Sequence, residues 1–386
     1  MPILPDVLMG AARAQTGLED FGGDTFREGL DVLCESLSSE AQLNQIGSAV
    51  VPGAIIAALA NRLKVVDWVK RHPNVSEESI EAPLVVIGMF RAGTTFLSYL
   101  LEKDERHRPL LRWEAGDSVP PPAPTTIRAD ARIAAARAAA AMLDQINPQV
   151  RIVQSEEPDG PTECIAVLNQ EFKSLLWEAM ANVPGYARWL RGSSHQSAYE
   201  YHRRVLQVLQ SAGVRGRWSL KSPHHALHLQ ALTAVYPNAR MVLMHRDPLV
   251  LCASVCSLIT TLTKTFSDAD HQRYIAEHWT DMLATSIERV DAFRAAHPGA
   301  PIVDVHYADL VADPLGTMRR VYAALGDELQ GQALAAMTRH VESHPKGRFG
   351  RHAYDLGKFG LNAGAINERF RHYVQRYDIP LEQTGG

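Results

Sequence analysis

The chain has 386 residues, 46% of them hydrophobic and 21% charged, and its formal net charge is −4 because 39 Lys and Arg residues nearly balance 43 Asp and Glu residues. This balance excludes a basic nucleic-acid-binding protein and an acidic disordered tail, and the apolar fraction is large enough for a sizeable core. The length fits one large α/β domain or two smaller ones. The composition therefore predicts a soluble globular protein without a nucleic-acid partner, for which an enzyme is the default interpretation.

Cysteine usage and hydropathy indicate the compartment. The four cysteines show no CxxC spacing and are too few for a disulfide framework, which favours a reducing cytoplasm. They are Cys34, Cys164, Cys252 and Cys256. The N-terminal residues lack the basic and apolar regions of a secretory signal. The most apolar run, 49–60, is shorter than the roughly 20 residues that span a bilayer. We expect a cytoplasmic protein with no transmembrane span, and a core helix at 49–60 is favoured over one that lies on a membrane or lines an apolar pocket.

The first part of the chain, residues 1–82, is expected to form a helical N-terminal extension. Helical patterning covers 24–37, 40–50 and 53–71, and no strand is recognisable there. Pro73 and the polar residues that follow it then interrupt the pattern. This extension would shape an acceptor pocket or make a contact between subunits, so a homodimer is one possible state of the protein.

From residue 83 onward, short apolar runs alternate with amphipathic helices, which predicts a parallel sheet. The four runs are 83–88, 217–222, 239–245 and 301–307. We therefore expect a three-layer α/β/α domain over 83–386 with a central parallel sheet. In such sheets ligands bind beyond the carboxyl ends of the strands, so the residues after each run are the place to look for chemistry.

A long insertion, 102–216, separates the first two of these strands and is expected to be mainly helical. An alanine-rich helix is predicted over 129–146, with further helices over 161–182 and 195–212. The insertion also carries aromatic side chains, most of which we expect in the core and some in an acceptor pocket. They are Trp113, Phe172, Trp177, Tyr186 and Trp189. After the last strand, helices are predicted over 313–325, 330–341 and 363–377.

The strongest local motif follows the first strand and has the spacing of a phosphate-binding P-loop, running from Gly88 to Thr95. The lysine position of that motif is Thr94, so the side chain that reaches the terminal phosphates of a nucleoside triphosphate is missing. Arg91 instead offers a fork of donors to a phosphate or sulfate oxygen, and the threonine hydroxyls add two more. The alternative is an ordinary strand-to-helix turn that uses glycine for its backbone angles.

A second motif ends the strand 239–245 in a charged turn, Arg246-Asp247-Pro248, with a helix behind it. Ser254 lies eight residues after Arg246, about two helical turns along. The two side chains would converge on one anion if the turn folds back toward the helix. Taken alone, Arg-Asp-Pro is also a common salt-bridged helix start.

With these two motifs the chain resembles the sulfotransferases that use 3′-phosphoadenosine 5′-phosphosulfate (PAPS). In that family, the first loop binds the 5′-phosphosulfate and the later Arg and Ser bind the 3′-phosphate. The first loop here reads Arg91-Ala92-Gly93-Thr94-Thr95, with alanine in place of the usual serine. The second pair is Arg246 and Ser254. The resemblance implies PAPS as donor, its product PAP, and no metal.

The resemblance extends over residues 83–377 and is greatest to bacterial sulfotransferases related to mycobacterial enzymes. It places Tyr307, in a segment like the family's Tyr-Glu-Asp-Leu, near the adenine. It also implies that a basic, glycine-containing loop at 346–352 closes over the 3′-phosphate, through Arg348 or Arg351.

Sulfuryl transfer requires a cation on the leaving-group oxygen and a base for the attacking hydroxyl. Lys221 ends a predicted strand, at a position where the family carries a lysine. Together with Arg91, it is the expected cation on the leaving-group oxygen. The alternative is that Lys221 is a solvated surface residue. Glu114 is narrowly favoured as the base over His224. The alternative for Glu114 is a salt bridge to Arg112 or another cation.

Three further features of the predicted site are open. Glu156, Glu157 and Glu163 would line the acceptor pocket or favour a helix start by their charge. His224 and His225 would cap a helix or contact donor or acceptor. As a pair they supply at most two ligands, so no metal is expected.

The sequence therefore predicts an enzyme that moves a sulfuryl group from PAPS to the hydroxyl of a small, apolar acceptor such as a lipid, sterol or phenol. The near-neutral charge disfavours a polyanionic glycan as acceptor. The alternatives are a P-loop nucleotide kinase or NTPase, and a nucleotide-binding protein that has lost catalysis.

Overall fold

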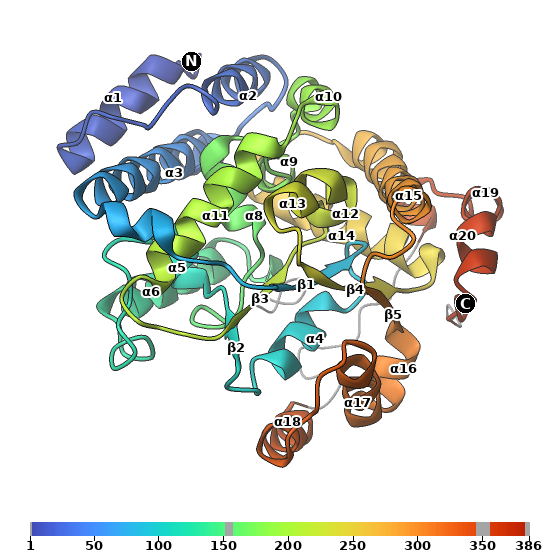
Figure 1. Ribbon diagram of the computed structural model, residues 1–386. Coiled ribbons are helices and arrows are strands. Elements are labelled where there is room, and N and C mark those ends of the chain that lie inside the picture. The colour runs from blue at the N-terminus through green and yellow to red at the C-terminus, as the bar shows by residue number, and fades with distance from the viewer. Residues whose placement is uncertain (1, 151–156, 345–355, 383–386) are drawn as a thin grey trace.

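A computed structural model of the chain describes residues 2–150, 157–344 and 356–382. Its centre is a five-stranded sheet in the order β2-β3-β1-β4-β5, with every neighbouring pair parallel (Figure 1). The strands are β1 (Leu84–Gly88), β2 (His107–Pro109), β3 (Arg217–Lys221), β4 (Arg240–His245) and β5 (Ile302–His306). The four predicted strands and their parallel arrangement are confirmed. Strand β2 was not predicted, because three residues are too short to show a strand period.

Helices cover both faces of the sheet, which confirms the three-layer α/β/α class. In Figure 1, one group lies below the strands and the other above them. The lower group is α4 (Thr94–Leu101), α16 (Tyr307–Ala312), α17 (Pro314–Ala324) and α18 (Gly331–Ser343). The upper group includes α11 (Gln196–Gln210), α12 (His224–Leu227), α13 (Leu229–Val235), α14 (Pro248–Phe266) and α15 (Gln272–Ala296). The carboxyl ends of β1, β3 and β4 lead through short turns into α4, α12 and α14.

The N-terminal extension consists of α1 (Pro5–Thr16), α2 (Arg27–Ser39), α3 (Gln45–Arg71) and the short η1 (Pro73–Glu77). The prediction of separate helices over 40–50 and 53–71 was wrong, because α3 continues through Pro52. Its start is capped by the Asn44 side chain, which accepts a hydrogen bond from the N–H of Gly47. Packing of the long apolar face outweighs the one helical hydrogen bond that proline removes.

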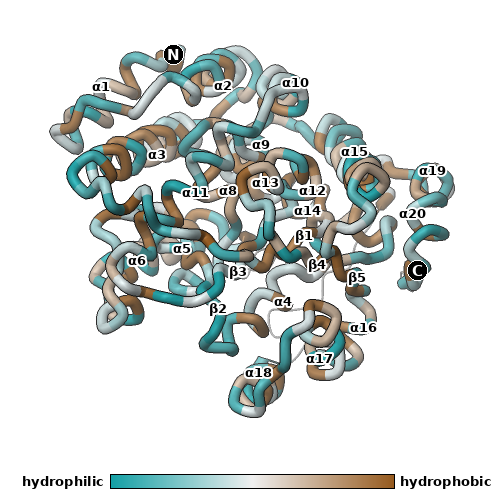
Figure 2. The backbone as a smooth tube through the Cα atoms, in the orientation of Figure 1, coloured by the Kyte–Doolittle hydropathy of each residue, from teal (hydrophilic) through white to brown (hydrophobic). Residues whose placement is uncertain are grey.

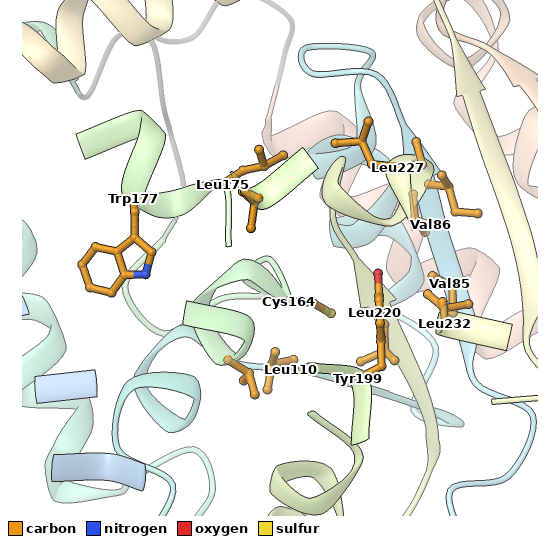
Figure 3. Packing of buried hydrophobic residues seen from close by; sticks show 14 of the residues in the cluster. Val85, Val86, Leu110, Cys164, Leu175, Trp177, Tyr199, Leu220, Leu227 and Leu232 are labelled. Carbon is orange, nitrogen blue, oxygen red and sulfur yellow. The ribbon is translucent and has the colours of Figure 1, made fainter. Parts of the chain in front are cut away.

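The extension shares one hydrophobic core with the sheet. Arg62 of α3 is buried, forms an ion pair with buried Glu171, and lies over the rings of Phe26 and Tyr201. Figure 2 shows hydrophobic residues gathered along the central strands. Figure 3 shows part of this core, where side chains of the central strands lie near Tyr199 of α11. Residues 2–82 are thus packed into the domain rather than attached by a linker.

The insertion is mainly helical, as predicted, and contributes the edge strand β2. Its helices before α11 are α5 (Arg112–Gly116), α6 (Ala131–Ile146), α8 (Ile165–Leu168), η2 (Asn169–Glu171), α9 (Leu176–Met180) and α10 (Pro184–Gly192). The prediction of one helix over 161–182 was wrong. Phe172 has φ 52°, in the left-handed region, and this residue ends the first part of the helical stretch.

The C-terminal part adds η3 (Gly357–Phe359), α19 (Ala363–Arg369) and α20 (Arg371–Arg376). The single helix predicted over 363–377 is instead two helices that meet at Phe370. Within the described residues, α3 and α14 are long and apolar enough to cross a membrane, but 56% and 67% of their apolar windows are buried. Core helices of globular proteins share these properties, so the absence of a membrane span stays a prediction.

Candidate active site

The loop between β1 and α4 has two residues in the left-handed region of the backbone, Arg91 at φ 70° and Gly93 at φ 93°. A Cβ atom on Gly93 would lie 2.6 Å from Cδ2 of Tyr307, so glycine is required both by the backbone angle and by the close approach of that ring. Ala92 is fully buried, and Thr94 begins α4. The loop therefore turns its backbone sharply into the start of a helix, as a phosphate-binding loop does.

The two predicted motifs meet in space. Arg91 Nε donates a hydrogen bond to Ser254 Oγ at 3.1 Å, across 163 residues of sequence. Arg246 Nη1 donates to the carbonyl oxygen of Arg91 at 2.9 Å, and the Arg246 guanidinium carbon lies 3.9 Å from the centre of the Tyr307 ring. The structure thus brings together the residues of the first loop, Arg246, Ser254 and Tyr307.

Arg246 has a partner that the sequence analysis missed. Glu382, near the C-terminus, accepts from Arg246 Nε at 2.6 Å and from Nη2 at 3.0 Å. The N–H of Glu382 donates to Asp247 Oδ2 at 2.7 Å, which holds the tail beside the turn. The sequence carries no local signal for this contact, because the tail returns to the sheet only after α20.

Lys221 lies at the carboxyl end of β3 and is buried, so the alternative of a solvated surface lysine was wrong. Its Nζ donates to Thr95 Oγ1 at 3.0 Å and lies 3.7 Å from Glu163 Oε1. The N–H of Cys164 donates to the carbonyl oxygen of Lys221 at 2.9 Å, and this contact sets Glu163 beside the lysine. A carboxylate, an ammonium group and a hydroxyl therefore converge next to the loop. The sequence predicted Glu163 as a residue that lines the acceptor pocket or favours a helix start, and not as a partner of Lys221.

Glu114 is fully buried and forms an ion pair with Arg108 rather than Arg112. Its Oε1 accepts from Arg108 Nη1 and from the N–H of Leu111, both at 2.8 Å, and its Oε2 accepts from Arg108 Nη2 at 2.6 Å. These bonds occupy both carboxylate oxygens. The arrangement ties α5 to β2 and favours a structural role for Glu114.

His224 lies in the first turn of α12 and is fully buried. Neither of its ring nitrogens has a hydrogen-bond partner among the described residues. Burial lowers the pKa of His224 well below its usual value, and neighbouring His195 and His225 lower it further, so the imidazole is neutral. His225 contacts the Tyr199 hydroxyl through Nδ1 at 2.8 Å.

Three of the predicted residues cannot be placed relative to the loop. Arg348, Arg351 and Glu156 lie outside the described residues. Of the five aromatic side chains named for the insertion, four are buried in the core, as expected for most of them. These four are Trp113, Phe172, Trp177 and Tyr186.

Comparison with known proteins agrees with the geometry. The model of a sulfotransferase family matches residues 83–331. Omega-hydroxy-beta-dihydromenaquinone-9 sulfotransferase Stf3 of Mycobacterium bovis and of Mycobacterium tuberculosis is 23% identical over an alignment of 269 residues, and the match covers 64% of this chain and 63% of the relative. The match therefore covers less than two thirds of the length of these relatives.

Two solved structures match almost the whole fold. The sulfotransferase STF9 from Mycobacterium avium is 32% identical, with a TM-score of 0.88 and 98% of both chains covered. The sulfotransferase STF1 from Mycobacterium tuberculosis H37Rv is 33% identical, with a TM-score of 0.81, covering 95% of this chain and 97% of that one. The family match over most of the chain and these two structures lead to one conclusion: the chain is an enzyme of the sulfotransferase family.

Proposed function

We propose that this chain transfers the sulfuryl group of PAPS to a hydroxyl of a small, apolar acceptor. The observation that carries the proposal is the hydrogen bond from Arg91 to Ser254, because it joins the loop expected at the 5′-phosphosulfate to the helix expected at the 3′-phosphate. A ligand with phosphate groups on both the 3′ and the 5′ position of one ribose would span these two places. PAPS has that form, and an ordinary nucleoside triphosphate does not.

In this proposal the donor is held by cations that the fold collects from different elements. The loop 91–95 binds the 5′-phosphosulfate through backbone N–H groups, the Arg91 guanidinium and the threonine hydroxyls. Arg246 and Ser254 bind the 3′-phosphate, assisted by Arg348 or Arg351, and Tyr307 lies beside the adenine. The formal net charge of −4 is then compatible with a polyanionic donor, because the positive charge is local.

The chemical step assigns separate roles to the cation and the carboxylate beside the loop. Lys221 donates a proton or hydrogen bond to the bridging oxygen as the bond from sulfur to that oxygen breaks, and Arg91 shares the stabilisation of the developing charge. Glu163, 3.7 Å from Lys221, accepts the proton of the attacking hydroxyl. It replaces Glu114 as the preferred base because both oxygens of Glu114 are already bonded. His224 is the remaining alternative.

The proposed class of acceptor is based on the name of a relative and on the net charge of this chain. The name of the relative Stf3 describes a sulfotransferase for a hydroxylated menaquinone, an apolar molecule with a hydroxyl. A similar class of acceptor fits a near-neutral protein better than a polyanionic glycan does. The four cysteines are buried and unpaired, which fits a cytoplasmic location.

Two measurements test the function. Isothermal titration with PAP in the absence of Mg²⁺ is expected to show tight binding, and incubation with sulfur-labelled PAPS and a panel of phenols, sterols and lipid alcohols is expected to label at least one acceptor. Mg²⁺-dependent ATP binding and hydrolysis without PAP binding would instead identify a kinase or NTPase. PAP binding without transfer to any member of a broad panel would favour a binding protein without catalysis.

A further inference from the structure

Three histidines outside the proposed donor contacts lie together at α12 and its neighbouring turns. His195 precedes α11, His224 opens α12, and His228 separates α12 from α13. One ring nitrogen from each can be chosen so that all three lie within 4.8 Å of one another. His195 and His224 are buried, and His228 is partly exposed.

The hydrogen bonding of these rings is incomplete in a way that suits a metal. His195 Nδ1 lies 3.1 Å from the carbonyl oxygen of Ser193, so Nδ1 carries the proton and Nε2 has the free lone pair. Metal-binding histidines are held in the same manner, by a carbonyl or carboxylate at the other nitrogen. His195 Nε2 and both nitrogens of His224 are buried, and no residue in the described part of the chain forms a hydrogen bond with them. Buried polar atoms of this kind cost free energy unless a ligand satisfies them.

The protonation state also fits, because metal binding needs neutral imidazole. Burial lowers the pKa of His195 to about 3 and holds the pKa values of His224 and His228 well below the usual value. Arg289 is the neighbouring cation, and its guanidinium donates to the carbonyl oxygens of Leu227 and Arg191. Its charge would favour an anionic ligand, such as hydroxide, in a fourth metal position.

The cluster opens onto space that a fourth ligand needs. A cavity of about 570 Å³ is lined by His195, His228, Ser193, Gln196 and Arg289, among others. The rings of His195 and His228 are stacked with their centres 3.4 Å apart, so one of them must turn before both lone pairs face one ion. His228 borders the cavity and is partly exposed, so it has room to turn.

We propose that His195, His224 and His228 bind one divalent transition metal ion of the zinc class, with the fourth position open to the cavity. Three imidazoles with one open position is a known arrangement for Zn²⁺, and imidazole also suits Co²⁺ and Ni²⁺. The ion would pin the segment before α11 to the turn between α12 and α13. This site is independent of the proposed donor contacts, because none of the three residues contributes to them, but a His224 that binds the metal cannot also serve as the alternative base.

The test uses the full chain without a histidine tag. Elemental analysis of protein purified without chelators is expected to find about one zinc per chain. After removal with EDTA, titration with Zn²⁺ is expected to show one site, and Co²⁺ is expected to give the visible absorption of a tetrahedral complex. Zinc should also raise the melting temperature, since it binds only the folded state.

His228→Ala is the main variant because His228 is the least buried of the three. Its affinity for Zn²⁺ is expected to fall by at least about tenfold, since even the loss of an outer-shell partner weakens metal sites by that factor. PAP affinity should be unchanged. The matched control is His297→Gln, because His297 Nδ1 contacts the carbonyl oxygen of Phe293 outside the cluster. His195→Gln is the second variant if His228→Ala does not fold.

The proposal is overturned if the wild-type chain neither retains zinc nor binds it in titration. It is also overturned if His228→Ala and His195→Gln bind zinc as tightly as His297→Gln, because the ion would then lie elsewhere. The Co²⁺ spectrum needs no variant, so a wild-type protein that binds Co²⁺ without a tetrahedral spectrum would likewise contradict it.

Discussion

Arg246 and Glu382 form a two-pronged ion pair, with two nitrogen–oxygen contacts of 2.6 and 3.0 Å. The same guanidinium lies over Tyr307 and donates to the backbone of the loop that carries Arg91. A carboxylate therefore occupies the side of Arg246 that a phosphate would use. If Arg246 binds the 3′-phosphate, the donor and the C-terminal tail compete for one cation.

Removal of this competitor is expected to strengthen donor binding. Glu382→Gln should lower the dissociation constant for PAP by about fivefold, the equivalent of about 1 kcal/mol for a partly exposed ion pair. The measurement is isothermal titration at low ionic strength. Glu368→Gln, which removes an exposed partner of Arg371, is the control and should leave PAP binding unchanged. Weaker binding in Glu382→Gln would mean that Glu382 positions Arg246 instead of competing with the donor.

The two candidate carboxylate bases should separate in a paired experiment. Glu163→Gln is expected to lower kcat by about 10²- to 10⁴-fold with PAP affinity kept, because it removes proton acceptance without removing a donor contact. Glu114→Gln is expected to lower the free energy of unfolding by about 3 kcal/mol, because it breaks a buried ion pair. Turnover and urea unfolding are measured on both variants. Full turnover in Glu163→Gln would return the assignment to His224.

The close approach of Gly93 and Tyr307 makes the loop sensitive to one methyl group. Gly93→Ala should weaken PAP binding by at least about tenfold, since it adds backbone strain at φ 93° and a contact of 2.6 Å with the tyrosine ring. Gly299→Ala is the matched control, because nothing lies within 4 Å of its added Cβ. Equal PAP affinity in the two variants would show that the loop does not form the donor site.

The buried ion pair of Arg62 and Glu171 is expected to stabilise the packing of the N-terminal helices on the rest of the domain. Arg62→Met is expected to lower the free energy of unfolding by about 3 to 5 kcal/mol, because it leaves a buried carboxylate without its partner. The double variant Arg62→Met with Glu171→Met should recover part of that loss. Both are measured by urea unfolding, and a single transition is expected. A separate early transition for the N-terminal helices would contradict the shared core.

Asp104 is expected to contribute to stability in a pH-dependent way. Burial raises the pKa of this carboxyl, but hydrogen bonds from Arg106 and Tyr322 outweigh burial and bring the pKa down to about 2. Because the pKa is depressed in the folded state, the stabilisation is present above about pH 4 and disappears as the pH falls toward 2. Asp104→Asn should therefore be less stable than the wild type at pH 7, with a difference that shrinks below pH 4.

Urea midpoints measured at decreasing pH, as far as the protein stays folded, check this expectation. Exposed Asp24 offers the control variant Asp24→Asn, which should follow the wild type throughout. A difference between Asp104→Asn and the wild type that stays constant from pH 7 to the lowest folded pH would contradict the assignment.

Much of the fold and part of the site are local properties of the sequence. The four longer strands show as apolar runs, and the loop from Gly88 to Thr95 shows as a fixed spacing of glycine and hydroxyl residues. Such signals are readable because a strand, a tight turn or a helix start depends on residues within a few positions of one another. The spacing of Arg246 and Ser254 is of the same kind, since both lie on one strand-turn-helix unit.

Other features depend on contacts between residues far apart in the chain. Glu382 reaches Arg246 across 136 residues, and Glu171 reaches Arg62 across 109. The spacing of Glu114 from Arg91 in the sequence made it a candidate base. Its burial against Arg108, however, depends on how β2 packs on the sheet. The meeting of His195 with His224 and His228 likewise requires the turn that brings α11 beside α13. Local patterns therefore specify the elements and the phosphate loop, whereas packing over long sequence distances selects which charged groups are free to act and which hold the fold together.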